Sequence, residues 1–356
     1  MNESLPQDIQ KDNTAAPGAD AQKPPEPAWK KTLKFLIRFG VSGGILTYLI
    51  CTRDIKWADF KLVKPWCIVA AFFAVYTQLS LTAIRWFTLL RAAGVKCSFR
   101  EAFSLQMQGM FFSQFLPGGS VGGDVVKAGI LATRTPPGGK FNVVFSIFVD
   151  RLCGLGALLI ALLGTCLICR DTIAQFPEGA RHGLLVMCAV CGALLCVVVC
   201  VFFSDLLYKV RFFKFFLDIA DRITKDTFKR AANAVALYRR CWKLLLGWVV
   251  ATTLVFFPVL SLPVWVMANG FEGAPYRGFL PCLMISNVSQ TIAAIPGSFG
   301  GTGTRDIACA EMMTAMGFTD TESGVIPILV TMVTLLVALS CSVFFIFDRG
   351  KRAPKT

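Results

Sequence analysis

The sequence predicts an all-α integral membrane protein with six to eight transmembrane helices and two re-entrant helical hairpins. Apolar residues make up 55% of the 356 positions and charged residues only 16%, whereas a soluble protein carries about a quarter charged residues. Several apolar stretches reach the roughly 20 residues that a crossing of the hydrocarbon core needs. Two more apolar stretches are broken in the middle by Pro and Gly. A large soluble all-α protein would have to bury segments such as 325–347 on every side, so we disfavour that class.

Six stretches have the length and hydropathy of full crossings: 35–52, 66–84, 141–168, 183–203, 244–268 and 325–347. The two broken stretches, 101–133 and 279–317, lie between the second and third crossings and between the fifth and sixth. The first arm of each has about 16 residues, or roughly 24 Å of helix, which is short for a crossing. We therefore predict two re-entrant hairpins, although eight full spans would also fit the sequence.

The distribution of Lys and Arg predicts that both chain ends are cytoplasmic. With this orientation, 27 basic residues lie in inside segments and 8 in outside segments, as the positive-inside rule requires. The exception is the outside loop 53–65 with four basic residues, which we expect Asp54 and Asp59 to offset in part. In this topology the first hairpin enters the inner membrane from the cytoplasm and the second enters from the opposite side.

The two broken stretches have similar tips. The first reads Pro-Gly-Gly-Ser-Val-Gly-Gly-Asp over 117–124, and the second reads Pro-Gly-Ser-Phe-Gly-Gly-Thr-Gly-Thr-Arg-Asp over 296–306. Broken segments at corresponding positions of two oppositely oriented halves are typical of inverted-repeat transporters. We therefore predict an inverted repeat with halves 29–168 and 183–348. Because the match is short, chance similarity of two Gly-rich turns remains the alternative.

The segments outside the transmembrane domain, 29–348, are predicted from composition. Residues 1–28 are polar and rich in Pro, Ala, Asp and Gln, which predicts a disordered cytoplasmic tail rather than a signal peptide. Residues 349–356 form a basic cytoplasmic tail. The stretch 205–243 interleaves Phe with basic residues, which favours an amphipathic helix on an anionic leaflet; a solvated connector is the alternative for its later half.

Neither the cysteines nor the net charge of +14 predicts a metal or nucleic-acid site. Most of the 14 cysteines lie in apolar segments, where Cys behaves as a small hydrophobe. The pairs Cys166/Cys169 and Cys188/Cys191 flank His182 with a spacing that suggests zinc in soluble proteins. Each pair lies near the end of a predicted transmembrane helix, so we favour helix packing and predict no metal and no cofactor. The basic residues lie between apolar segments, where anionic lipid explains them, and we expect no nucleic-acid partner.

The glycine-rich breaks are candidate binding sites. Non-helical backbone at membrane depth is tolerated only where protein or water surrounds it, and glycine lets a ligand approach the main chain. A helix that begins after the break directs free N–H groups and a positive dipole end toward an anion such as phosphate. The alternative is that these glycines only let the hairpins pack closely.

Ionisable residues next to the breaks favour binding. An ionisable side chain at membrane depth is costly unless it is paired or hydrated, and is a functional candidate by default. A structural ion pair, such as Arg151 with Asp124 or Asp306, is the alternative and is compatible with binding. We expect the basic members to bind phosphate, and the acidic members to pair with them or bind a headgroup amine. The candidate substrate-binding residues are Arg305, Asp306, Asp124, Lys127, Asp150, Arg151, Gly122, Gly123, Gly300, Gly301, Gln114 and Gln290.

No pattern indicates catalysis. The sequence has one His, and we find neither a nucleophile elbow nor a nucleotide-binding loop with Lys in place. The Gly-rich tips do not follow a strand, so they are not a dinucleotide fingerprint. We therefore do not expect an enzyme.

Four segments resemble successive signatures of one family. They are Ile-Arg-Trp-Phe-Thr-Leu-Leu-Arg-Ala-Ala-Gly over 84–94, Phe-Leu-Pro-Gly-Gly-Ser-Val-Gly-Gly-Asp-Val-Val-Lys over 115–127, Val-Asp-Arg-Leu-Cys-Gly-Leu over 149–155 and Ile-Pro-Gly-Ser-Phe-Gly-Gly-Thr-Gly-Thr-Arg-Asp over 295–306. In order and approximate spacing they are similar to the lysylphosphatidylglycerol synthase transmembrane (flippase-like) family, over roughly residues 30–350.

The resemblance implies a membrane domain that binds lipid and, in the best-understood members, moves a modified phospholipid between leaflets. Bifunctional members carry a soluble aminoacyl-transfer domain after the membrane part; this chain stops at Thr356, so lysyl transfer is not implied. The family's last motif usually ends in Arg-Glu, whereas this chain has Arg305-Asp306.

We therefore expect a lipid flippase or lipid-binding transporter without ATPase activity. Its partners would be membrane lipids, such as an anionic phospholipid or a lipid phosphate, and a separate lipid-modifying enzyme. The alternatives are a secondary transporter of a small solute or ion, and a protein that presents lipid to a separate synthase.

Overall fold

The structure is a computed structural model that describes residues 44, 47, 50–53, 55–115, 119–136, 139–202, 238, 241–294 and 303–349. In these parts of the chain every element is helical apart from one isolated β-bridge. The predicted tails 1–28 and 349–356 (apart from Arg349) and most of the crossing 35–52 and the connector 205–243 lie outside the described residues.

Five helical stretches in the described parts are long and apolar enough to cross a membrane. They correspond to the second to sixth predicted crossings, which confirms an all-α membrane fold. They are α2 (Pro65–Ala92), α5 (Lys140–Ile168), α7 (Glu178–Phe202), the continuous stretch of α10 (Trp242–Ala251), the π-helical turn η3 (Thr252–Phe256) and α11 (Phe257–Asn269), and α14 (Asp320–Ser340) with α15 (Ser342–Arg349). Two short helices, η1 (Asp59–Leu62) and α6 (Arg170–Ile173), lie in the connections.

The second and fifth crossings run antiparallel and are joined near both ends. Val63, just before α2, forms the β-bridge with Phe271, just after α11. At the other end of α2, the hydroxyl of Tyr238, which precedes α10, donates to the carbonyl of Leu89 at 3.0 Å. We call the two ends of the helix bundle the Pro65 end and the Ala92 end, after the first and last residues of α2.

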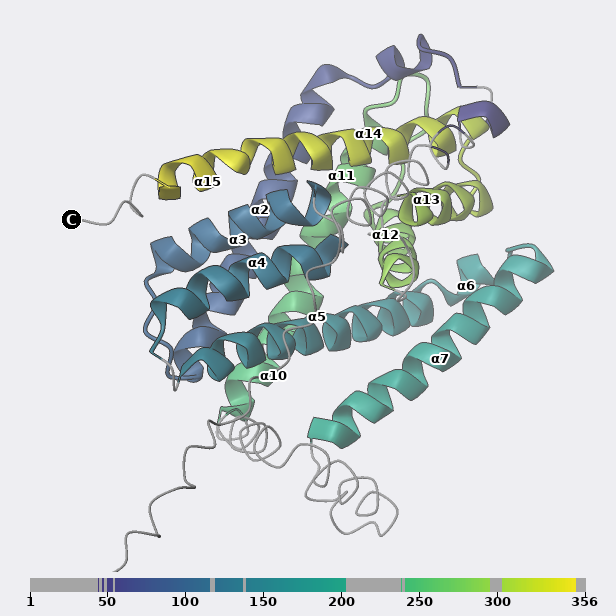
Figure 1. Cartoon of the computed structure of the whole chain (residues 1–356). Helices are drawn as coiled ribbons and strands as arrows, with labels where there is room; N and C mark the ends of the chain where they lie inside the picture. Colours follow the sequence, from purple (N-terminus) through teal and green to yellow (C-terminus); the bar gives the residue numbers. More distant parts are fainter. Residues whose placement is uncertain are drawn as a thin grey trace, which may run out of the picture.

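Two helical hairpins enter this bundle from opposite ends (Figure 1). Helices α3 (Phe99–Phe115) and α4 (Gly119–Arg134) follow α2, so the base of the first hairpin lies at the Ala92 end, where Glu101 accepts from Arg134 at 2.6 Å. Helices α12 (Phe279–Ala293) and α13 (Thr304–Ala315) follow α11, so the base of the second hairpin lies at the Pro65 end. There Arg277, just before α12, donates to the carbonyl of Gly317, just after α13, at 3.0 Å.

The helix contacts of one half of the chain have counterparts in the other half. The contact of α2 with α3 corresponds to that of α11 with α12, and the contact of α4 with α5 corresponds to that of α13 with α14. Across the halves, α5 packs against α12 as α14 packs against α3. Together with the antiparallel α2 and α11, this pattern supports the predicted inverted repeat.

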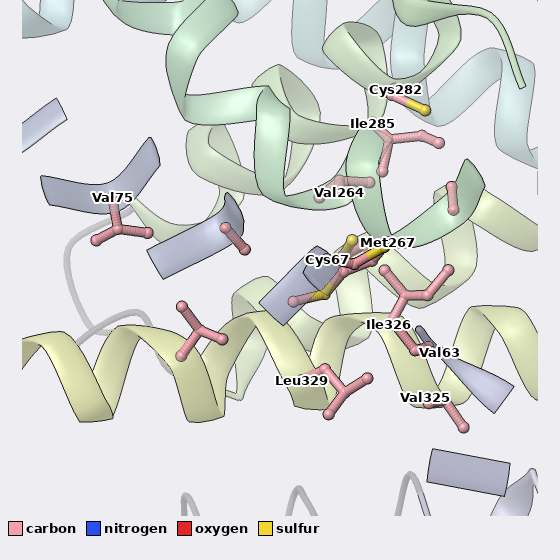
Figure 2. Close-up of a cluster of buried hydrophobic side chains, with 14 of the residues drawn as sticks. Val63, Cys67, Val75, Val264, Met267, Cys282, Ile285, Val325, Ile326 and Leu329 are labelled. Carbon is pink, nitrogen blue, oxygen red and sulfur yellow. The ribbon is translucent and has the colours of Figure 1, made fainter. Parts of the chain in front are cut away.

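The largest buried hydrophobic cluster joins α2 and α11 to α12 and α14 (Figure 2). Small side chains such as Cys67 and Cys282 are fully buried there, beside larger ones such as Met267 and Ile326. Cysteine thus serves as a small core residue, as predicted. Eight of the 15 residues of the short helix α12 are also buried inside the protein.

Helix α7 lies at the periphery. Among the described helices it packs mainly against α5. Only 11% of the most apolar 18-residue stretch of α7 is buried, against 50% of the corresponding stretch of α5. Cys169 and Cys191 are buried in the cluster that joins these two helices. In the described parts of the chain, no group of three or more His, Cys, Asp or Glu side chains could hold a metal ion.

We predict that a methyl group at Gly270 destabilises the contact between α2 and the end of α11. A Cβ at Gly270 would lie 2.0 Å from the Sγ of Cys67, so Gly270→Ala should cost about 1–3 kcal/mol by overpacking. The measurement is thermal unfolding of the purified protein in detergent. At Gly247 on α10 a Cβ meets nothing within 4 Å, so Gly247→Ala is the matched control. Adding Cys67→Ala to Gly270→Ala should restore part of the loss; equal unfolding temperatures for the two glycine variants would contradict the contact.

Candidate functional site

A buried ion pair joins three transmembrane stretches near the Ala92 end. The guanidinium of Arg85 on α2 donates to both carboxylate oxygens of Asp150 on α5, Nε to Oδ1 at 2.7 Å and Nη2 to Oδ2 at 3.3 Å. Both side chains are buried. The Nη1 of Arg85 donates to the hydroxyl of Thr252 at 3.2 Å, in the π-helical turn η3. Such turns within α-helices are frequent at functional sites.

The ammonium of Lys127 on α4 contacts three other side chains. It lies 2.9 Å from Asp124 Oδ1 one turn earlier and donates to Gln106 Oε1 on α3 at 3.0 Å. It also lies 4.9 Å from the ring centroid of Trp86 on α2, within the range of a cation–π interaction. These contacts within the protein satisfy the buried lysine.

Asp124 also binds Arg151, the residue after Asp150 on α5. Arg151 Nε donates to Asp124 Oδ2 at 2.7 Å, and its Nη2 reaches the carbonyl of Ser120 at 3.4 Å. The side chain of Arg151 is 53% exposed, whereas that of Asp124 is 13% exposed. The predicted pair of Arg151 with Asp124 is therefore present, and Asp124 bridges a buried cation and an accessible one.

These five residues, Arg85, Asp124, Lys127, Asp150 and Arg151, form what we call the first charge cluster. Trp86, the residue after Arg85, contacts Lys127, and Arg151, the residue after Asp150, contacts Asp124, so the two ion-pair systems are neighbours. Three basic and two acidic groups leave one positive charge without a carboxylate of its own. The partner of Asp150, Arg85, was not among the residues that the sequence singled out.

A second charge cluster lies at the start of α13. Arg305 Nη2 lies 3.1 Å from Asp306 Oδ1, and both residues bind the hydroxyl of Thr331 on α14. Asp306 is buried, and the side chain of Arg305 is mostly buried. With one base and one acid, this cluster carries no net charge.

The two clusters occupy corresponding places in the two halves. In each half an acid on the second helix of the hairpin binds the twelfth residue of the next helix: Asp124 binds Arg151 on α5, and Asp306 binds Thr331 on α14. The arginine of the first half is thus replaced by a threonine in the second. This correspondence supports the predicted inverted repeat independently of the helix contacts.

The first break is shorter than the sequence predicted. Helix α4 begins at Gly119, so Gly122 and Gly123 are helical and Asp124 lies in the second turn. A Cβ at Gly123 would lie 2.3 Å from the carbonyl oxygen of Gly109 on α3. The prediction that the break spans 117–124 is therefore wrong, because α4 already begins at Gly119 and Gly123 serves close helix packing.

The remaining four candidates are not members of either charge cluster. Gln114 on α3 and Gln290 on α12 are partly buried, whereas Gly300 and Gly301 lie outside the described residues. Helix α13 starts at Thr304, after Gly303 with a φ of 92°, a backbone conformation that favours glycine. This agrees with a helix that begins just after the second break.

The sequence missed Arg85 because the predicted crossing ended at residue 84, whereas α2 continues to Ala92. Arg85 was counted among the cytoplasmic basic residues, but it is buried. A signal was present, since the apolar run continues through Trp86 to Leu90. Thr252 and Thr331 gave no signal, because threonine is unremarkable in an apolar helix.

Arg53, in the loop 53–65, pairs with carboxylates outside its own loop. Its guanidinium lies 2.8 Å from Glu311 on α13 and 2.6 Å from Asp320 on α14. Asp59 instead accepts from the backbone N–H of Lys56 in its own loop, and Asp54 lies outside the described residues. Arg53 thus ties the loop to the base of the second hairpin.

Comparison with known proteins identifies the family. No curated protein sequence matches the chain significantly. A family model described as the lysylphosphatidylglycerol synthase TM region matches residues 35–341, which includes both helical hairpins and both charge clusters. The protein is therefore a multi-pass membrane protein, and the chain belongs to the lysylphosphatidylglycerol synthase transmembrane-region family.

Proposed function

We propose that the protein is a lipid flippase or lipid-binding transporter of the inner membrane, which moves an anionic phospholipid or lipid phosphate between leaflets without ATPase activity. The observation that carries the proposal is the first charge cluster. Five ionisable groups are gathered among helices long and apolar enough to cross a membrane, and one positive charge has no carboxylate of its own. Charges in a membrane domain are costly and mark substrate paths by default.

The position of the basic residues supports a cytoplasmic Ala92 end. Arg91, Lys96, Arg100, Arg134 and Lys140 all lie at this end of the bundle. When the buried Arg85 and Lys127 are left out of the comparison, 25 basic residues lie in inside segments against 8 outside. Both chain ends would then be cytoplasmic, and the two hairpins would be re-entrant from opposite sides of the membrane.

The arrangement of the hairpins supports alternating access. In inverted-repeat transporters, one half of the protein moves against the other around a site formed by broken helices. Here the hairpins enter from opposite ends, and each half contributes one charge cluster at its hairpin. Movement of one hairpin against the other would open the path to either leaflet in turn, and the two clusters would bind the phosphate along this path.

We expect the purified protein to accelerate translocation of a fluorescent phosphatidylglycerol in liposomes, measured as the fraction accessible to a membrane-impermeant quencher. Arg305→Ala should lower the rate at least tenfold, because it leaves the buried Asp306 without its counter-charge. The matched control is Arg170→Ala, since Arg170 is an exposed arginine whose described ion pair is with its exposed neighbour Asp171. A wild-type rate no higher than that of protein-free liposomes would overturn the proposal. Equal rates for Arg305→Ala and Arg170→Ala would remove Arg305 from the path.

A further inference from the structure

Arg151 lies on an exposed apolar stripe of α5. Val144 and Phe148 are each 55% exposed and precede Arg151 by seven and three residues, so the three side chains share one face of the helix. An exposed apolar face of a transmembrane helix contacts lipid tails. The side chain of Arg151, half exposed on this face, is thus accessible from the bilayer.

Helix α4 carries a matching stripe. Val121 and Val125, one turn apart, are each 65% exposed. Helix α4 packs beside α5 (Figure 1), and Asp124 on α4 binds Arg151 on α5 across the seam. The two helices together form an apolar wall with a single guanidinium at the seam.

The guanidinium of Arg151 is the accessible member of the first charge cluster, and it shares its carboxylate with a second cation. Asp150 is hydrogen-bonded to Arg85, and Asp124, the carboxylate that binds Arg151, also lies 2.9 Å from the buried Lys127. No hydrogen bond from Nη1 of Arg151 occurs among the described residues. Arg151 lies about 16 Å of helix beyond the start of α5, a depth at which an arginine that faces hydrocarbon and shares its carboxylate with a lysine is costly. A phosphate would supply both the negative charge and the acceptors, and arginine suits its geometry.

We propose, on the basis of the function proposed above, that the seam of α4 and α5 is a lateral docking site for an anionic phospholipid. The phosphodiester binds Arg151 directly from the bilayer, and the acyl chains lie along Val121, Val125, Val144 and Phe148. The apolar wall decides between two sources of phosphate. A soluble phosphate ion would have to shed its water beside valine side chains, whereas a lipid presents phosphate and hydrocarbon together.

The test is photo-crosslinking of the full-length protein in nanodiscs. A photoreactive phenylalanine analogue replaces Phe148, and in a second protein it replaces Leu185, a lipid-facing residue of α7 with 56% exposure. With a trace of radiolabelled phosphatidylglycerol in phosphatidylcholine, we expect several-fold more cross-linking at position 148 than at 185. Unlabelled phosphatidylglycerol should compete, and 10 mM inorganic phosphate should not. Equal yields at the two positions, or competition by inorganic phosphate, would overturn the lateral lipid site without the need for any further variant.

Variants of Arg151 identify the group that binds. Arg151→Gln should remove the excess cross-linking at position 148, and Arg151→Lys, which keeps the charge, should keep part of it. If Arg151→Gln leaves the excess unchanged, the assignment of Arg151 is wrong.

The translocation assay on the same preparations separates this inference from the proposed function. A wild-type protein that translocates lipid but shows no cross-linking dependent on Arg151 would overturn the docking site alone. Cross-linking that depends on Arg151 without translocation would support the docking site and overturn the flippase.

Discussion

Asp150→Ala will destabilise the protein more than loss of any exposed carboxylate. The substitution leaves the guanidinium of Arg85 buried. Among the described residues, the hydroxyl of Thr252 is then its remaining hydrogen-bond partner. Removing one partner of a buried ion pair typically costs about 3–5 kcal/mol, because the remaining charge is uncompensated. The loss is measured as the fraction of monodisperse protein left after heating in detergent.

Two further variants make this result specific. Asp171→Ala breaks an exposed pair with Arg170 and should have little effect, as surface pairs contribute about 0–1 kcal/mol. The double variant Arg85→Leu, Asp150→Leu should recover most of the lost stability, since apolar residues often replace a buried pair without penalty. If Asp150→Ala is no less stable than Asp171→Ala, the pair does not hold the three transmembrane stretches together.

The double variant also separates structure from transport. A folded protein that no longer translocates lipid would show that the charges of Arg85 and Asp150 are needed beyond stability. A folded and active double variant would restrict this pair to a structural role. Lys127, Asp124 and Arg151 would then be the members of the first charge cluster available to a lipid.

The crossings could be predicted from the sequence because the requirement of a bilayer for long apolar helices is local. The second to sixth crossings are therefore present at nearly the predicted positions. Their ends were less predictable. The second crossing was ended before Arg85, because a charge after an apolar run resembles an interfacial boundary. Arg85 remains inside only because Asp150, 65 positions later in the chain, neutralises it, and such a partner is not visible in the local sequence.

The glycine-rich tips show a second limit. Glycine permits unwound backbone, but it also permits two helices to approach closely, and the sequence pattern is the same in both cases. Gly123 is helical and lets α4 pack closely against α3. Gly303, in contrast, has a positive φ directly before α13, as expected at a break. The charged residues were found from sequence because a charge near an apolar break is rare whichever role the glycines have.

Gly123→Ala will impair both the stability of the first hairpin and lipid translocation. The new Cβ would lie 2.3 Å from the carbonyl oxygen of Gly109 and 3.0 Å from the Cβ of Ser113. A backbone carbonyl inside α3 cannot rotate away as a side chain can, so α3 and α4 must separate. The cost should be about 1–3 kcal/mol.

The separation also acts on the first charge cluster, because the stem of Lys127 crosses α3 at Gly109 and its ammonium binds Gln106. A shift of α4 would lengthen both this hydrogen bond and the contact of Asp124 with Arg151, so translocation should fall at least tenfold even below the unfolding temperature.

The control is Gly129→Ala on the same helix, where a Cβ meets nothing within 4 Å. It should be neutral or slightly stabilising, since alanine favours helix over glycine by about 1 kcal/mol. Equal behaviour of the two variants in unfolding and translocation would mean that close packing of α3 and α4 does not position the cluster. A difference in unfolding alone would limit Gly123 to stability.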